Sequence, residues 1–262
     1  MTTRAKQQLT PEARNALFQH LKNDDIKERR FTLEHSKPRS FRLMMVSRDF
    51  CVAARHALRH SKLQITSWHD SEPRWVFDAY GGRTFTHASA LAFMSLVKPR
   101  FRHLIIAGSN NLEPEIDDQF IRSHFVGIPK LTITSYDELK PHIHRLIVLM
   151  GPKLKSLACS AKYLEPAENF PLLTLNEYTF CVDAYDKPEN MDFVLAHRIE
   201  KIQLVLVGGA QIDSLVLSEN GPVQPSLKVL VLTHQSNSPL LLPQWFYTRV
   251  PNLKMVNANT SS

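Results

Sequence analysis

One short pattern of apolar residues recurs along the last two thirds of the chain. It reads Pro-x-Φ-x-x-Φ-x-Φ, where Φ is an apolar residue. Its four clearest copies begin at prolines: Pro99, Pro152, Pro225 and Pro251. Three looser copies drop or shift the proline and have these first apolar residues: Ile128, Phe170 and Ile199. Each copy has the length and the alternating end of a strand with one buried face, so each predicts a short strand.

The spacing of the copies indicates a repeat. Their first Φ residues fall at 101, 128, 154, 170, 199, 227 and 253, so the steps are 27, 26, 16, 29, 28 and 26 residues. Self-similarity at such a period, built on Φ-x-x-Φ-x-Φ, resembles the leucine-rich repeat, although the usual Asn or Cys is missing unless Cys159 is counted. The step of 16 residues is too short for a strand and a helix, which predicts an extended loop there. The alternative is an ordinary α/β domain whose strands happen to look alike.

The segments between the copies complete the predicted architecture. Apolar residues at helical spacing predict helices over 116–125, 136–150, 191–196 and 243–250. The resemblance implies an α/β fold over residues 101–262, an irregular leucine-rich-repeat solenoid with parallel strands on a concave face and helices or loops on a convex face. Because each repeat cannot bury its apolar side alone, the stacked repeats would share one core.

The outward positions of the predicted strands form the candidate binding face. Alternation of side chains along a strand assigns the residues between the Φ positions to it. We expect these residues to bind a substrate: His103, Ile105, Thr132, Thr134, Ser156, Ala158, Ser160, Thr174, Asn176, Gln203, Val231 and Thr233. The set is small and uncharged, whereas a nucleic-acid face would carry Lys, Arg and aromatic residues. The pattern therefore favours a protein substrate, whose identity it leaves unknown, and makes nucleic acid an unlikely ligand of this face.

Residues 62–100 have a different composition and read as a junction and N-terminal cap of the solenoid. Gln64 and its neighbours predict an early edge strand, and the 74–78 stretch predicts a second strand. A Gly-Gly turn follows near 80–83, and 88–97 has helical periodicity that leads into the copy at Phe101.

The first 61 residues predict a small all-helical unit. Thr10 can cap a helix whose first turn holds Pro11 and Glu12, and a second helix can begin at Ser40 and continue to Leu58. The chain has a net charge of +7, and residues 1–60 hold 13 Lys or Arg against 6 Asp or Glu, so the whole excess lies there. Such an asymmetry indicates an acidic partner, protein or nucleic acid, or else a solvated basic face without a partner.

The same helical unit resembles an F-box. The resemblance is carried by Leu-Thr-Pro-Glu at 9–12, Ala-Leu at 16–17, Leu21, Asp-Ile at 25–26 and Val-Ser-Arg-Asp-Phe at 46–50. It departs from that family in the residue between Leu and Pro, in Phe50 where Trp is usual, and in a long basic insertion near 27–40.

The resemblance implies a partner. An F-box binds the Skp-family adaptor of a cullin-RING ubiquitin ligase, and leucine-rich repeats commonly follow it and capture substrate. The residues implied to face the adaptor or to build the core of the unit are Leu9, Pro11, Leu17, Leu21, Val46 and Phe50. The alternative is a helical cap that only shields the first repeat.

Other kinds of chemistry find little support. The three cysteines have no C-x-x-C spacing, which favours reduced thiols in the cytoplasm or nucleus, and no apolar run reaches the about 20 residues of a membrane span. His142 and His144 have H-x-H spacing on a predicted helix, where their side chains diverge. We expect no catalytic residue, no metal and no cofactor. The sequence thus predicts a noncatalytic substrate-recognition adaptor, with a repeat scaffold unrelated to ubiquitin or a nucleic-acid-associated protein as alternatives.

Overall fold

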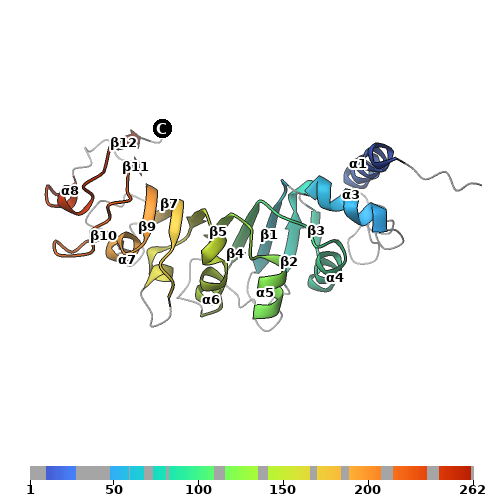
Figure 1. The fold of residues 1–262 in the computed structure, drawn as a ribbon, viewed down its shortest axis with the longest axis horizontal. Helices are drawn as coiled ribbons and strands as arrows, with labels where there is room; N and C mark the ends of the chain where they lie inside the picture. Colours follow the sequence, from blue (N-terminus) through green and yellow to red (C-terminus); the bar gives the residue numbers. More distant parts are fainter. Residues whose placement is uncertain are drawn as a thin grey trace, which may run out of the picture. The chain divides into compact units, whose positions relative to one another are not determined.

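A computed structural model describes most of the chain. The described residues are 10–27, 48–58, 60–67, 73–80, 83–108, 116–134, 141–165, 170–183, 189–207, 215–234 and 242–260. The chain divides into two compact units, Met1–Asn110 and Asn111–Ser262. The boundaries predicted at 61 and 100 both fall inside the first unit. Each unit is an assembly of strands and helices (Figure 1), which confirms the predicted α/β class.

The first unit begins with two helices, α1 (Pro11–Lys27) and α3 (Arg48–Leu58). Thr10 caps α1 as predicted, since its Oγ1 accepts a hydrogen bond of 3.2 Å from the Ala13 N–H. On α3, Ala54 and Leu58 are fully buried, whereas Val52 on the opposite side is exposed. This one-sided burial is the amphipathic pattern that was expected of the second helix.

The strands of the first unit run in the order β3-β2-β1-β4. Their bounds are β1 (Lys62–Ser67), β2 (Arg74–Phe77), β3 (Arg83–Phe85) and β4 (His103–Gly108), with a 3-10 turn η1 (Asp78–Tyr80) and helix α4 (His87–Val97) between them. β1 pairs parallel with β4 and antiparallel with β2. The prediction that β1 is an edge strand is therefore wrong, because the β2–β3 hairpin adds two strands beside it.

The second unit holds six parallel strands in the order β5-β6-β7-β9-β11-β12. They are β5 (Lys130–Thr134), β6 (Ser156–Ala158), β7 (Thr174–Asp183), β9 (Arg198–Val207), β11 (Val229–His234) and β12 (Met255–Thr260). Two short strands, β8 (Glu189–Asn190) and β10 (Leu215–Val216), form a separate parallel pair. Every main strand is thus one copy of the repeated apolar pattern, and successive copies in this unit are hydrogen-bonded to one another from β5 to β12.

Short helical segments connect these strands. They are α5 (Asp118–His124), α6 (Pro141–Met150), η2 (Gly151–Lys153), η3 (Ala161–Leu164), α7 (Met191–Leu195) and α8 (Phe246–Arg249). Helices α5, α6 and α7 lie on one side of the strands of this unit (Figure 1). The Φ residues form the core: Leu131, Leu157, Ile202 and Leu230 are each at most 1% exposed.

The register of β7 corrects the fourth copy of the pattern. Leu157 of β6 lies opposite Tyr178, and Leu175, Tyr178 and Phe180 lie opposite Ile199, Ile202 and Leu204 of β9. The copy therefore begins at Leu175, not at Phe170, and the steps on its two sides become 21 and 24 residues. The apparent step of 16 residues disappears, and the return segment contains the helical turn η3 rather than only an extended loop.

The error arose because the segment from Phe170 to Phe180 satisfies the pattern in two phases. Leu173 and Leu175 are both buried, as the earlier phase requires, but Leu173 precedes the strand. The ladder selects the later phase, since β7 pairs with β9 along its whole length in that register. A pattern of three apolar positions cannot distinguish two overlapping phases that are both apolar.

Candidate interaction surface

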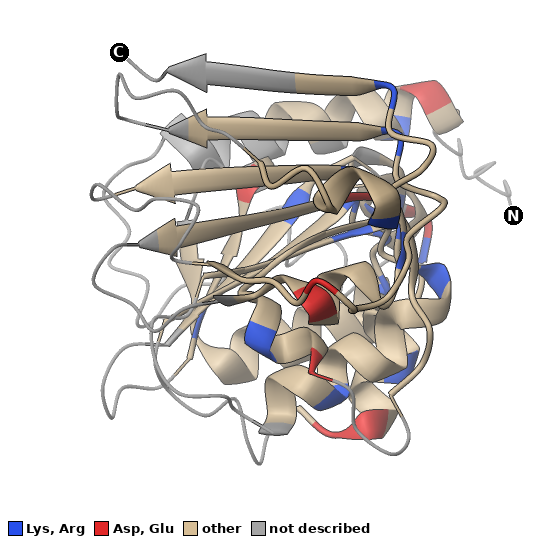
Figure 2. Ribbon diagram, turned by 90° about the vertical axis from the view of Figure 1, so that its left-hand side faces the viewer, with Lys and Arg blue, Asp and Glu red and all other residues tan. Residues whose placement is uncertain are grey.

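One face of the six parallel strands in the second unit carries none of the described helices (Figure 1). Along β9 the side chains alternate, so that Ile202 and Leu204 are buried while Gln203 and Val205 are half-exposed. The same alternation holds on β5 and β6, where Thr132 and Ala158 lie outward. Figure 2 shows these strands edge-on, stacked one above the other. We call this side the open face.

Strand register aligns the outward residues of the open face into rows across the strands. The second row contains one residue on each of five strands, namely Thr132, Ala158, Thr179, Gln203 and Val231. A third row contains Cys181, Val205 and Thr233. Four predicted residues, Thr132, Ala158, Gln203 and Val231, are thereby brought together in one row, and Thr233 lies in the next.

The first row is less uniform than predicted. It contains Lys130, Ser156, Glu177, Lys201, Val229 and Met255. Lys201 Nζ lies 2.7 Å from Glu177 Oε1. The expectation of an uncharged face is therefore wrong for this row. It failed because the fourth copy was taken in the wrong phase, which hid Glu177, and because Lys130 and Lys201 were not counted as outward positions.

Several predicted residues lie elsewhere. Thr174 and Asn176 are exposed at the start of β7, ahead of the three rows, because the copy begins at Leu175. Their places in the second and third rows are taken by Thr179 and Cys181, which the sequence analysis missed. Ser160 follows β6 and caps η3, with its side chain accepting from the Lys162 N–H at 3.4 Å. Thr134 is exposed at the end of β5.

The first unit carries its own outward pair. His103 and Ile105 are half-exposed on β4, and Ile105 lies opposite Gln64 of β1 in the parallel ladder. Their buried neighbours Leu104 and Ile106 pair with Leu63 and Ile65. Strand β1 therefore follows the same inward and outward alternation as the repeated copies.

The residues implied to face an adaptor lie on or near the two N-terminal helices. Pro11 and Leu17 are exposed on α1, and Leu17 is 37% exposed. Leu21 and Phe50 are positions of α1 and α3 whose side chains lie outside the description, and Leu9 and Val46 lie outside the described residues. An ion pair between Arg14 and Asp49 joins the two helices. Val52, which the analysis did not single out, is 55% exposed on α3.

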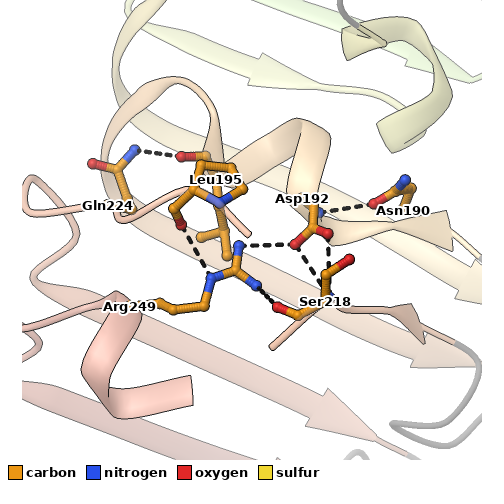
Figure 3. A network of polar contacts seen from close by, with 7 residues as sticks. Asn190, Asp192, Leu195, Ser218, Gln224 and Arg249 are labelled. Atoms are coloured by element: carbon orange, nitrogen blue, oxygen red, sulfur yellow. Dashed lines mark hydrogen bonds and ion pairs between the residues drawn. The ribbon is translucent and has the colours of Figure 1, made fainter. Parts of the chain in front are cut away.

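A buried polar network ties together the return segments of the second unit (Figure 3). Arg249 of α8 lies 2.8 Å from the Asp192 carboxylate of α7, and their side chains are only 3% and 15% exposed. The guanidinium also donates to the backbone carbonyls of Pro222 and Ser218. Asp192 in turn accepts from the Ser218 N–H at 3.2 Å. Backbone groups thus bind both charged side chains, while Arg249 Nη2 has only its ion-pair contact with Asp192, and the pair connects three segments of the chain.

Close packing around this pair requires glycine at position 221. A Cβ atom on Gly221 would lie 2.5 Å from Arg249 Nη2 and 2.7 Å from Asp192 Oδ1. No space is left for a small molecule between the two charges. Their geometry stabilises the fold and offers no site for chemistry.

The described cysteines and histidines show how far reactive side chains gather in the described part of the chain. Cys181 is exposed as a residue, yet partial burial of its thiol raises its pKa, which opposes thiolate formation at neutral pH. His142 and His144 are half-buried on α6, and within the described ranges no three His, Cys, Asp or Glu side chains gather as metal ligands. The open face thus carries charged side chains in its first row and polar and apolar side chains in the second and third rows.

Among the described helices, none has the length and apolar character needed to cross a membrane. The chain matches no family model, no curated protein and no solved structure.

Proposed function

We propose that the protein is a noncatalytic substrate-recognition adaptor of a cullin-RING ubiquitin ligase of the SCF type. In this proposal the parallel strands and their helices form an irregular leucine-rich-repeat solenoid that binds a protein substrate. The N-terminal helices bind a Skp-family adaptor and through it a cullin. The protein would promote ubiquitin transfer by proximity alone, because the scaffold would hold a substrate lysine near a charged ubiquitin carrier.

The observation that carries the proposal is the regular, open strand face of the second unit. Its copies keep the Φ residues opposite one another from β5 to β12, at steps of 21 to 28 residues from Leu154 onward. That regularity supports a leucine-rich-repeat arrangement, in which each unit packs only on its neighbours. The row of Thr, Ala, Gln and Val side chains has the mixed polar and apolar character of a protein-binding surface.

Support for adaptor binding comes from exposed apolar residues on the N-terminal helices. The side chains of Leu17 on α1 and Val52 on α3 are both more than one-third exposed, although other residues of the N-terminal helical unit are buried. Apolar residues left on the surface of small helices are candidates for a protein contact. Residues 1–60 contain 13 basic and 6 acidic residues, and this excess of positive charge suits an acidic surface on the partner.

The test is co-purification of the full chain with a Skp-family adaptor. We expect a stable complex that is lost in a Leu17→Asp variant and in a Val46→Asp/Phe50→Asp double variant. Because Leu17 is already exposed, its replacement should leave the fold intact, as thermal unfolding would verify. The matched control is Val126→Asp, since Val126 is 38% exposed in the second unit and has no proposed role. That variant should retain the complex.

A folded chain that forms no complex at micromolar concentration would reject the ubiquitin-ligase proposal. The second candidate, a repeat scaffold unrelated to ubiquitin, would then stand. It has its own support: Ala54 and Leu58 of α3 are fully buried, and Arg55 donates to the Val97 carbonyl at the end of α4. Such packing is what a cap over the first strands requires.

A further inference from the structure

One turn recurs before three strands of the second unit and ends each time on a lysine. In Pro-x-Leu-Lys at 152–155, 225–228 and 251–254, the leucine N–H donates to the carbonyl three residues earlier. The donors are Leu154, Leu227 and Leu253, with donor–acceptor distances of 3.2, 3.5 and 3.0 Å. Leu154 and Leu227 are at most 1% exposed. The turn buries Leu154 and Leu227, leaves Leu253 half-buried, and exposes the following lysine each time.

Each of these lysines is also fixed by the strand before it. The N–H of Lys155 donates to Pro129 O at 2.8 Å, that of Lys228 to Glu200 O at 2.9 Å, and that of Lys254 to Lys228 O at 2.8 Å. The three lysines therefore occupy one structural position, at the amino-terminal ends of β6, β11 and β12. Strands β11 and β12 are hydrogen-bonded neighbours, so Lys228 and Lys254 at their amino-terminal ends are one strand spacing apart, about 4.8 Å.

Further cations lie at the same ends of the strands. Figure 2 shows basic residues where the uppermost strands begin. We call the following set the basic edge: Lys130, Lys153, Lys155, Arg198, Lys228 and Lys254. All six are exposed. These six cations lie together at one edge, although residues 61–262 as a whole are neutral, with 19 basic and 19 acidic residues.

Acidic residues neutralise only the middle of this edge. Glu200 pairs with Lys228 at 2.8 Å, and Glu177 pairs with Lys201 at 2.7 Å. Among the described residues, no carboxylate forms an ion pair with Lys130, Lys155 or Lys254. Lys254 lies beside Lys228, whose charge is already paired with Glu200, so Lys254 keeps its own charge available. The two ends of the basic edge are therefore positioned to attract anions.

We propose that the basic edge binds an extended acidic segment of a polypeptide. Carboxylates of that segment would contact Lys130 and Lys155 at one end and Lys254 at the other, while its remaining side chains lie on the adjoining rows of Thr, Ala and Val. The adjoining second row, with Thr132, Ala158, Thr179, Gln203 and Val231, offers no aromatic side chain on which a base could stack, which favours a polypeptide over single-stranded nucleic acid. The proposal deepens the proposed function, because it gives the chemistry of the substrate that the strands would bind.

The binding test uses the full chain and a fluorescein-labelled peptide of alternating Glu and Ser, 12 residues long by design. Fluorescence anisotropy would measure the affinity at low and at high ionic strength. We expect binding that weakens as salt rises, since exposed charges are screened over about 10 Å at 0.1 M salt. A Lys155→Gln/Lys254→Gln variant should bind about tenfold more weakly, the sum of two exposed ion pairs.

The matched control removes the same charge elsewhere. Arg74 on β2 and Arg122 on α5 are exposed and lie outside the basic edge, so Arg74→Gln/Arg122→Gln should change the affinity less than twofold. A Lys155→Arg/Lys254→Arg variant keeps the charge and should keep binding, which separates a lost contact from a disturbed turn. The Leu17→Asp variant should also bind the peptide normally, so failure of adaptor binding and failure of this proposal remain distinguishable.

Three results would overturn the proposal. The first is no binding of the acidic peptide at low salt. The second is an equal loss in the two glutamine double variants, which would mean attraction by net charge alone. The third is tighter binding of a single-stranded oligothymidine that the Lys155→Gln/Lys254→Gln variant abolishes, which would assign the basic edge to nucleic acid.

Discussion

Arg249 illustrates how a single residue can hold distant segments together. Its side chain is 3% exposed, and burying a guanidinium is costly unless its charge and its donors are satisfied. Asp192 supplies the opposite charge, and the carbonyls of Pro222 and Ser218 accept the other hydrogen bonds. Asn190 completes the arrangement by accepting from the Asp192 N–H at 3.0 Å. The network fixes the return segments that lead into and out of β9 and β11.

Replacing Arg249 should therefore destabilise the protein strongly. We expect Arg249→Met to lower the free energy of unfolding by about 3 kcal/mol, because the Asp192 carboxylate is left buried without a counter-charge. Adding Asp192→Asn should recover part of the loss. Arg145→Met is the control: the Arg145–Asp118 pair is 42% and 48% exposed, so its loss should cost less than about 1 kcal/mol. Urea unfolding measures the free energy of unfolding of each variant. Equal losses for Arg249→Met and Arg145→Met would contradict the argument.

His197 gives the protein a pH dependence that can be predicted in sign. Burial lowers the pKa of this imidazole, while a hydrogen bond with the Leu164 backbone opposes the shift. The folded protein thus keeps His197 neutral at a pH where the unfolded chain, with a pKa near about 6.5, already binds a proton. Because the unfolded state takes up more protons there, stability is present above about pH 6.5 and is lost as the pH falls.

A comparison of variants isolates this contribution. His197→Gln should show a shallower loss of unfolding free energy between about pH 7 and 5.5 than the wild-type protein. Denaturant unfolding at several pH values measures the slopes. Indistinguishable slopes for wild type and His197→Gln would contradict the assignment.

At the scale of elements, β7 marks the limit of what the sequence could predict. The repeated pattern located all seven strands from β4 to β12 that carry it, because those from β4 to β11 bury the apolar side chains of their copies on one face. It misjudged β7, since Phe170, Leu173 and Leu175 match the pattern as well as Leu175, Tyr178 and Phe180 do. Only hydrogen bonding to β6 and β9 separates the two phases, and that information is not local.

The candidate site was predictable to the same extent. Thr132, Ala158, Gln203 and Val231 were assigned to one face by alternation alone, and the ladder aligns them. Thr179 was missed because the copy in β7 was assigned to the earlier phase. The β2–β3 hairpin was missed as a neighbour of β1, because a sequence with a single apparent strand in 74–78 does not reveal how it pairs.

The phase of β7 can be tested by two alanine substitutions. Phe180 is 2% exposed within the strand, so Phe180→Ala should lower the free energy of unfolding by about 3 to 5 kcal/mol through loss of burial and a cavity. Phe170 is half-exposed before the strand and stacks on the rings of His144 and His197, so Phe170→Ala should cost about 1 to 2 kcal/mol. The opposite order, measured by urea unfolding, would favour the earlier phase.

At the scale of the molecule, the second unit is a stack of strands in which each is stabilised by its two neighbours. Strand β9 lies between β7 and β11, and its Ile202 and Leu204 are at most 1% exposed. Strand β12 is the last in the order and pairs only with β11 among the described strands. Its Met255 and Val256 are 49% and 42% exposed, although Val256 is opposite Leu230, which is 1% exposed. Burial thus falls sharply at this strand.

Such a stack should open from its end. In native-state hydrogen exchange we expect the amides of β12 to exchange with the smallest opening free energy of the six strands, and those of β9 with the largest, because stability in a stack depends on neighbouring contacts. Leu230→Ala should cost about 2 to 5 kcal/mol, whereas Val256→Ala should cost less than about 1 kcal/mol, since its side chain is already half in water. If β12 were as protected as β9 and Val256→Ala as costly as Leu230→Ala, the strands would unfold as one cooperative block. The acidic segment proposed to bind Lys254 offers a further check, because a ligand that contacts β12 should slow exchange there more than in β9.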